Sequence, residues 1–318
     1  MLRRTVRSLR AKGLRETWAV VPAALVETTS ATISAPIRRR YSQRIRQRDL
    51  APVPIGEPID LSVMSFVQEN DVPELVASVR SFLVHVGVPK EFIVVSDGTI
   101  TPESRDVIDS ILPGVLSVQS VQRYLGAYEV PGAVRDFMAR SAWGAKLASI
   151  MALNDRTPAL YADSDLWYFP RAQELREVCA GDTPLFMQDI APFLDERFLS
   201  GNSIGDETDV PLNAGFLFVP NPLDWTESSA RLAALSGEPI GDTEQAAVHL
   251  TFRLAGGRPF PPTRYVVNPR RTRPRLDLRG QDPCVRHYTR PQRGLFWLEV
   301  ARFEALRRRE QARSLETV

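Results

Sequence analysis

Two aspartates separated by one small residue, Asp163-Ser164-Asp165, follow the apolar run 158–162. On an extended backbone alternate side chains point to the same face, so both carboxylates would face one way and could hold one divalent cation. A cation held at the carboxyl end of a strand can in turn bind a diphosphate. The alternative is an acidic turn that closes a buried strand, because Asp and Ser are common in turns.

The composition is that of a folded globular protein, with 318 residues, 43% hydrophobic and 25% charged. It excludes a chain that is disordered throughout. Cys179 and Cys284 lie far apart and form no Cys-x-x-Cys pair, so the sequence favours neither a disulfide framework nor a zinc site. We therefore expect a reducing compartment, and specifically the cytoplasm.

The first 58 residues differ from the rest in charge, and we expect them to form a basic arm and linker. The net charge of the whole chain is only +2, yet basic residues crowd its first fifty positions. They are Arg3, Arg4, Arg7, Arg10, Lys12, Arg15, Arg38, Arg39, Arg40, Arg44, Arg46 and Arg48. The apolar stretch 18–26 is interrupted by Pro22 and is too short to span a bilayer. It is also a poor secretory signal.

Residues 1–48 have two interpretations. In the first, they dock peripherally, either on an anionic membrane surface at the inner face of the membrane or on a partner. In the second, they are a solvated leader whose arginines aid solubility. Nucleic-acid binding is not expected, because only Trp18 among the aromatic residues precedes Tyr41 and the body has no basic stripe.

From residue 59 the pattern alternates between strands and helices. Apolar runs predict strands at 61–67, 92–95, 115–121 and 158–162, and helical spacing predicts helices at 72–86, 102–112 and 133–151. Such alternation indicates an α/β fold with a single Rossmann-like, mixed but mainly parallel sheet flanked by helices. Ligands of such sheets gather at the carboxyl ends of the strands.

The second half alternates less strictly. We expect strands at 185–187 and 212–219, helices at 222–235 and 243–254, and short segments at 265–267 and 285–288. The polar excursion 193–210 is long for a compact domain and predicts a functional loop or a disordered one. The predicted division is an arm at 1–58, one catalytic domain at 59–297 and an Arg-rich helix at 298–318.

The three histidines lie in different sequence settings. His85 lies between apolar neighbours on a predicted helix, and His249 lies within another helix, so both are expected to be structural. His287 differs from both, because it ends a short predicted strand between Arg286 and Tyr288.

The order of these segments resembles a known family. The segments are 61–67, 92–98, 143–147 (WGAKL), 160–165 (LYADSD), 212–216 (LNAGF), 243–245 (TEQ) and 287–289 (HYT), with Trp297 behind them. Together they resemble the nucleotide-diphosphosugar glycosyltransferases of the type-A fold, and the second half is most similar to the glycogenin-like family-8 enzymes. The resemblance covers residues 61 to 297.

The resemblance implies a metal site and a donor site. Asp163, Asp165 and His287 would hold Mn²⁺ or Mg²⁺, and an imidazole beside two carboxylates suits Mn²⁺ better. The donor nucleotide-sugar would be contacted by Gln68 and Asp97 at the ribose or base, by Lys146 at phosphate or sugar, and by Asp163 and Ser164. The Gly and Lys that the family usually has after the histidine are missing here. Arg290 and Arg293 lie in the stretch that follows, and either guanidinium could bind the diphosphate.

The resemblance also implies a sugar and acceptor pocket. Asn213 and Gln245 would line it, together with an acidic residue that is either Glu244 or Asp242, since the family commonly has Asp immediately before the Gln. Asp189 resembles an acceptor-site or catalytic carboxylate, and it could equally cap a helix or turn.

The expected activity is metal-dependent transfer of a sugar from a nucleotide-sugar, most often a UDP-sugar, to a hydroxyl of a glycan, lipid or protein. The family-8 likeness implies retention of the anomeric configuration, whereas the early segment also resembles inverting family-2 enzymes. Two rival functions stay open. One is nucleotidyl transfer, although 68–71 lacks the Gly-rich basic loop of those enzymes. The other is non-catalytic binding, with the basic arm as the interaction surface.

Overall fold

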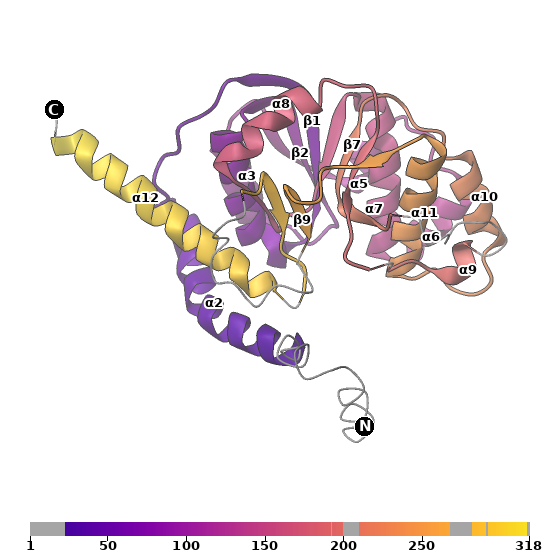
Figure 1. The fold of residues 1–318 in the computed structure, drawn as a ribbon, viewed down its shortest axis with the longest axis horizontal. Helices are drawn as coiled ribbons and strands as arrows, with labels where there is room; N and C mark the ends of the chain where they lie inside the picture. Colours follow the sequence, from indigo (N-terminus) through magenta and orange to yellow (C-terminus); the bar gives the residue numbers. More distant parts are fainter. Residues whose placement is uncertain (1–22, 192, 200–209, 268–281, 291, 317–318) are drawn as a thin grey trace.

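The structure, a computed structural model, describes residues 23–191, 193–199, 210–267, 282–290 and 292–316. Its centre is a seven-stranded sheet in the order β3-β2-β1-β4-β7-β6-β8 (Figure 1). The strands are β1 (Pro58–Val67), β2 (Val88–Ser96), β3 (Leu116–Ser120), β4 (Ala159–Ala162), β6 (Leu185–Gln188), β7 (Leu212–Val219) and β8 (Arg258–Pro259). Strands β3, β2, β1 and β4 run parallel, and β7 is antiparallel to both of its neighbours. The predicted mixed, mainly parallel sheet is confirmed.

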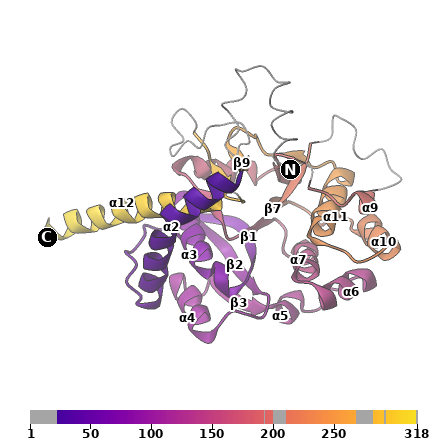
Figure 2. The same cartoon turned by 90° about the horizontal axis from the view of Figure 1, so that it is seen from below.

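Each face of the sheet is covered by helices, because its strands are apolar on both sides. In β2, Phe92 and Val94 pack into one hydrophobic cluster, while Ile93 and Val95 pack into the other. A strand buried on both faces reads as a continuous apolar run. One face carries α3 (Val72–His85) and α4 (Pro102–Ile111). The other carries α5 (Val121–Leu125), α6 (Gly132–Arg140), α7 (Ala142–Met151), α10 (Thr226–Ala234) and α11 (Gly241–Leu254), and Figure 2 shows the two sets apart.

The helix predicted at 133–151 is two helices. Ser141 has extended backbone angles, ends α6 and caps α7, and its hydroxyl accepts a hydrogen bond from the Trp143 amide. A serine that caps the next helix interrupts the preceding one. The spacing of apolar residues does not reveal such an interruption. Gly144 lets the two helices approach closely, since a Cβ there would lie 2.4 Å from the Phe137 carbonyl carbon.

Other boundaries also differ from the prediction. The strand expected at 115–121 ends at Ser120, whose hydroxyl caps the short helix α5. The helix expected from 222 begins at Thr226, after a turn in which the Asp224 carboxylate accepts from the Thr226 amide. The excursion at 193–210 contains α9 (Glu196–Leu199), and residues 200–209 lie outside the described residues.

A second, three-stranded sheet was not predicted. It has the order β5-β10-β9, formed by β5 (Leu166–Tyr168), β10 (Val285–His287) and β9 (Tyr265–Val267). Strand β10 pairs antiparallel with β5, so His287 lies opposite Leu166. Strand β5 begins directly after the acidic triplet. Its pairing with β10 therefore brings His287, from late in the chain, close to the end of β4.

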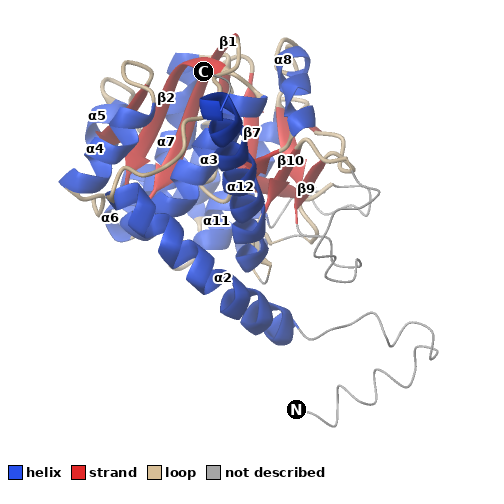
Figure 3. Ribbon diagram, turned by 90° about the vertical axis from the view of Figure 1, so that its left-hand side faces the viewer, coloured by secondary structure: helices blue, strands red, loops and turns tan. Residues whose placement is uncertain are grey.

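The helices α2 (Ala23–Arg46) and α12 (Phe296–Glu316) cross beside α3 and extend away from the body (Figures 1 and 3). They are joined by a buried carboxylate. Glu304 of α12 accepts from Arg44 of α2 at 2.8 Å and from Arg80 of α3 at 2.9 Å. Part of the predicted basic arm therefore packs against the body. Within the described ranges, no helix is long and apolar enough to cross a membrane.

The contact of α12 with α3 predicts a pH dependence of stability. The ring of His85 lies 6.4 Å from that of Phe303, and burial, followed by the charge of Arg307, lowers the pKa of His85 to about 4 from 6.5. Between these values the unfolded chain binds more protons, so stability falls as the pH falls from 6.5 towards 4. We expect His85→Gln to reduce the slope of the unfolding free energy against pH, by an amount that corresponds to at most about one bound proton. Urea unfolding at several pH values measures this slope. An unchanged slope in the variant would contradict the packing of α12 on α3.

Candidate active site

One pocket, with a cavity volume of about 700 Å³, lies at the edge of the main sheet where β1, β2 and β4 end. It brings together all but one of the residues that the sequence indicated. They are Gln68, Asp97, Lys146, Asp163, Ser164, Asp165, Asn213, Asp242, Glu244, Gln245, His287, Arg290 and Arg293. The exception is Asp189, which does not line this pocket.

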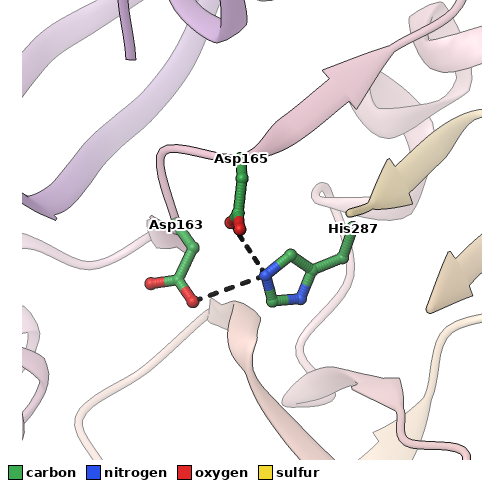
Figure 4. A group of neighbouring side chains, drawn as sticks. All are labelled: Asp163, Asp165 and His287. Carbon is green, nitrogen blue, oxygen red and sulfur yellow. Dashed lines mark hydrogen bonds and ion pairs between the residues drawn. The ribbon is translucent and has the colours of Figure 1, made fainter. Parts of the chain in front are cut away.

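The centre of the pocket is formed by two carboxylates and an imidazole (Figure 4). His287 Nε2 lies 3.0 Å from Asp165 Oδ1 and 3.6 Å from Asp163 Oδ2. One ligand atom from each residue lies within 4.8 Å of the others. Two carboxylate oxygens and one imidazole nitrogen directed at a common point are a donor set for a divalent transition metal. The three residues therefore fit such an ion.

The two carboxylates do not converge by strand alternation. Strand β4 ends at Ala162, and Ser164 and Asp165 form a turn before β5. The extended-backbone explanation for this pair was therefore wrong. The turn is held by the Asp163 amide, which donates to the Gly215 carbonyl at 2.8 Å, and by the Tyr288 amide, which donates to the Asp165 carbonyl at 3.1 Å.

A line of buried hydrogen bonds orients the imidazole. Asn213 donates through Nδ2 to Asp189 Oδ2 at 2.9 Å, which turns its Oδ1 towards His287 Nδ1, also at 2.9 Å. The Gly215 amide donates to the same Oδ1. Since Oδ1 can only accept, His287 must donate from Nδ1 and direct Nε2 towards the two aspartates. Such partners behind a ligand fix its tautomer, so Asp189 acts through Asn213.

The charges around the imidazole shift the pKa values of His287 and Asp165 in opposite directions. Burial lowers the pKa of His287, but Asp165 and Asp163 outweigh burial and leave the pKa above its ordinary value. Burial raises the pKa of Asp165, but His287 and Arg293 outweigh it and leave that pKa lowered. A divalent cation bound by these residues would compete with the proton on Nε2.

Lys146 stands on the other side of Asp163. Its ammonium lies 3.4 Å from Asp163 Oδ1 and 3.8 Å from Glu244 Oε1. Burial lowers the pKa of Lys146, yet the two carboxylates more than offset this and raise it, so the side chain stays charged. Burial also raises the pKa of Glu244 to about 7. Asp242 lines the same pocket but is exposed, so Glu244 is the carboxylate beside Lys146.

Asp71 is a pocket residue that the sequence analysis did not assign to the site. It accepts from Arg293 Nη2 at 2.7 Å and from Gln68 Nε2 at 2.9 Å. Arg293 Nε in turn lies 3.3 Å from Asp165 Oδ2. Asp71 therefore holds the guanidinium of Arg293 beside Asp165. The only sequence signal was its place three residues after Gln68, at the end of β1.

The remaining predicted residues form the rim. Asp97, after β2, accepts from the amide and hydroxyl of Thr99 at 2.9 and 2.6 Å. Gln245 donates to the Phe193 carbonyl at 3.0 Å. Gln68 and Arg290 are exposed. The pocket thus has polar groups from the ends of β1 and β2 to the start of α11.

Gly215 leaves the space that the imidazole occupies. A Cβ at this position would lie 2.2 Å from His287 Cε1 and 2.7 Å from Asp163 Oδ2. We expect Gly215→Ala to displace the ring, to cost about 1–3 kcal/mol of folding stability and to abolish Mn²⁺ binding in calorimetry. Gly132→Ala is the matched control, since nothing lies within 4 Å of a Cβ there. Wild-type Mn²⁺ affinity in Gly215→Ala would contradict this geometry.

No protein-family model matches this chain, and no curated protein matches it. Solved structures do. The galactosyltransferase LgtC, in complex with donor and acceptor sugar analogues, has a TM-score of 0.50 at 13% identity, over 77% of this chain and 95% of that one.

Two further structures are similar at lower scores. GlyE of Streptococcus pneumoniae has a TM-score of 0.48 at 13% identity, over 80% of this chain and 64% of that one. Mouse xyloside xylosyltransferase 1 has a TM-score of 0.46 at 14% identity, over 72% of this chain and 97% of that one. The likeness to LgtC, together with the sheet order, shows that this chain has the glycosyltransferase type-A fold.

Proposed function

We propose that the chain is a metal-dependent glycosyltransferase that moves a sugar from a nucleotide-sugar to an acceptor hydroxyl. The observation that carries the proposal is the convergence of Asp163, Asp165 and His287 in a pocket at the carboxyl edge of this sheet. The place of the pocket agrees with the ligand sites of open α/β sheets, which lie outside the carboxyl ends of the strands.

Mn²⁺ is the ion that suits this donor set best, with Mg²⁺ as the alternative. When bound, such an ion would neutralise the negative charge that builds up on the departing diphosphate. The chain supplies the orientation of its ligands through Asn213 and through the turn that follows β4.

The donor's nucleotide is proposed to lie over the ends of β1 and β2, where Gln68 and Asp97 offer hydrogen-bonding groups to a base or ribose. UDP is the proposed nucleotide. Two cationic groups flank the aspartates, Lys146 on one side and Arg293 on the other. Each can bind phosphate oxygens, the ammonium as a point charge and the guanidinium with two parallel hydrogen bonds.

The acceptor and the transferred sugar are proposed to lie at the end of the pocket where α11 begins. Glu244, Gln245 and Asp242 line this end, and each has an oxygen that can accept from a sugar hydroxyl. The acceptor molecule would be a glycan, a lipid or a protein.

We also propose that the basic arm contacts an anionic membrane surface at the cytoplasmic side. Arg39 and Arg40 of α2 are exposed, and each basic residue near such a surface contributes about 1 kcal/mol. Arg39→Glu with Arg40→Glu should lower co-sedimentation with phosphatidylserine vesicles at least about tenfold. Arg123→Glu with Arg258→Glu, both exposed on other elements, makes the same charge change and should have less effect. Equal losses in the two double variants would argue against a defined membrane face.

Asp165→Asn tests the proposed activity. The wild type should release UDP from at least one UDP-sugar when Mn²⁺ is present. This variant should lower kcat by more than about 100-fold, because the cation would lose an anionic ligand and would be held less tightly beside the diphosphate. Its melting temperature should stay within about 5 °C of the wild type. Asp60→Asn is the control, since Asp60 is exposed and pairs with Lys90 at the surface. Full turnover by Asp165→Asn would refute the assignment.

A further inference from the structure

Large apolar side chains are exposed at one end of the pocket. Within the described part of the chain, such side chains include Trp143 at 48%, Phe193 at 47% and Ile240 at 49% exposure. Trp143 itself lines the pocket. Ile240 precedes Gly241 of the lining, and Phe193 is bonded through its carbonyl to the lining residue Gln245. Three exposed apolar groups beside polar lining residues indicate a binding surface.

The indole of Trp143 is held in a fixed position although it is half exposed. Its Cε2 would lie 3.1 Å from a Cβ placed on Gly241, so the ring packs directly on the start of α11. The Lys146 ammonium lies 5.7 Å from its ring centroid, within the range of a cation–π contact. Among the described residues, no acceptor bonds its indole N–H. The ring therefore packs against Gly241 and Lys146, and its N–H is available to a ligand.

The position of the ring excludes the nucleotide as its ligand. The nucleotide is proposed to lie at the ends of β1 and β2, whereas α11, on which the indole packs, contacts β7, beyond β4 in the sheet order. Asp163 and Asp165, which follow β4, separate the two ends. Figure 1 shows α7 and α11 together on the β7 side. Two groups are proposed for that end, the transferred sugar and the acceptor. The transferred sugar is joined to the diphosphate beside the aspartates, so the half-exposed indole is left to the acceptor.

We propose that Trp143 is the stacking platform for a pyranose ring of the acceptor, a proposal that rests on the proposed function. One face of a pyranose carries C–H groups with partial positive charge, and they are attracted to the negative face of an aromatic ring. Its hydroxyls can donate to the Asp242 carboxylate or the Gln245 amide, which line the pocket nearby. An acyl chain fits less well, because these polar groups interrupt the apolar surface.

Acrylamide quenching of tryptophan fluorescence tests this site without turnover. Trp167, Trp225 and Trp297 are buried, so Trp143 supplies the accessible signal once Trp18, which lies outside the described residues, is replaced by Phe. The probes are the methyl glycosides of glucose, galactose and mannose, added with UDP and Mn²⁺. We expect at least one glycoside to protect Trp143 from acrylamide, whereas UDP with Mn²⁺ alone does not. Absence of protection by every glycoside, or full protection by UDP with Mn²⁺ alone, would overturn the proposal.

Variants separate stacking from general disturbance. Trp143→Ala should weaken binding of the protecting glycoside about tenfold in calorimetry, and Trp143→Phe should retain most of it. Leu254→Ala is the control, because Leu254 is 63% exposed at the far end of α11. An equal loss in Trp143→Phe and Trp143→Ala, or in Leu254→Ala, would contradict stacking. Release of UDP by the wild type is measured separately, so failure of the proposed function can be told from failure of this site.

Discussion

One imidazole, that of His287, lies against the carboxylates of Asp163 and Asp165, and this contact organises the pocket around it. The contact joins residues more than a hundred positions apart, and His287 meets Asp165 at 3.0 Å. The second sheet makes this possible, because β10 pairs with β5 directly after the aspartates. Gly215 gives the ring its space, and Asn213 fixes which nitrogen faces the acids. Buried polar networks whose members are hydrogen-bonded specify a single arrangement of the core.

Charge balance explains the neighbours of this centre. Three carboxylates, on Asp163, Asp165 and Glu244, are largely buried and would repel one another without compensation. Lys146 and Arg293 stand on opposite sides and provide it. An ammonium and a guanidinium are also suited to a diphosphate. Lys146 and Arg293, which balance the charge of these carboxylates, therefore also fit the proposed donor. Asp71 holds one Nη group of Arg293, while the Nε of Arg293 lies 3.3 Å from Asp165 Oδ2.

The sequence predicted the sheet class because apolar runs of strand length alternate with helical spacing. Most pocket residues came from the resemblance, which depends on the order of several modest motifs and not on any one of them. The sequence could not predict features that depend on partners distant in the chain. The three-residue strands β5, β9 and β10 are too short to show a period. Ser141 splits a helix through a single side-chain hydrogen bond. The roles of Asp71 and Asp189 arise only from tertiary contacts with Arg293 and Asn213.

If the proposed function is right, one site binds a divalent cation and a nucleoside diphosphate together. This can be measured by calorimetric titration of the full chain with UDP, in Mn²⁺ and then in excess chelator. We expect saturable UDP binding in Mn²⁺ that chelation weakens at least about tenfold, because Asp163 and Asp165 alone would repel the diphosphate. Equal UDP affinity with and without the cation, or no UDP binding in either condition, would contradict it.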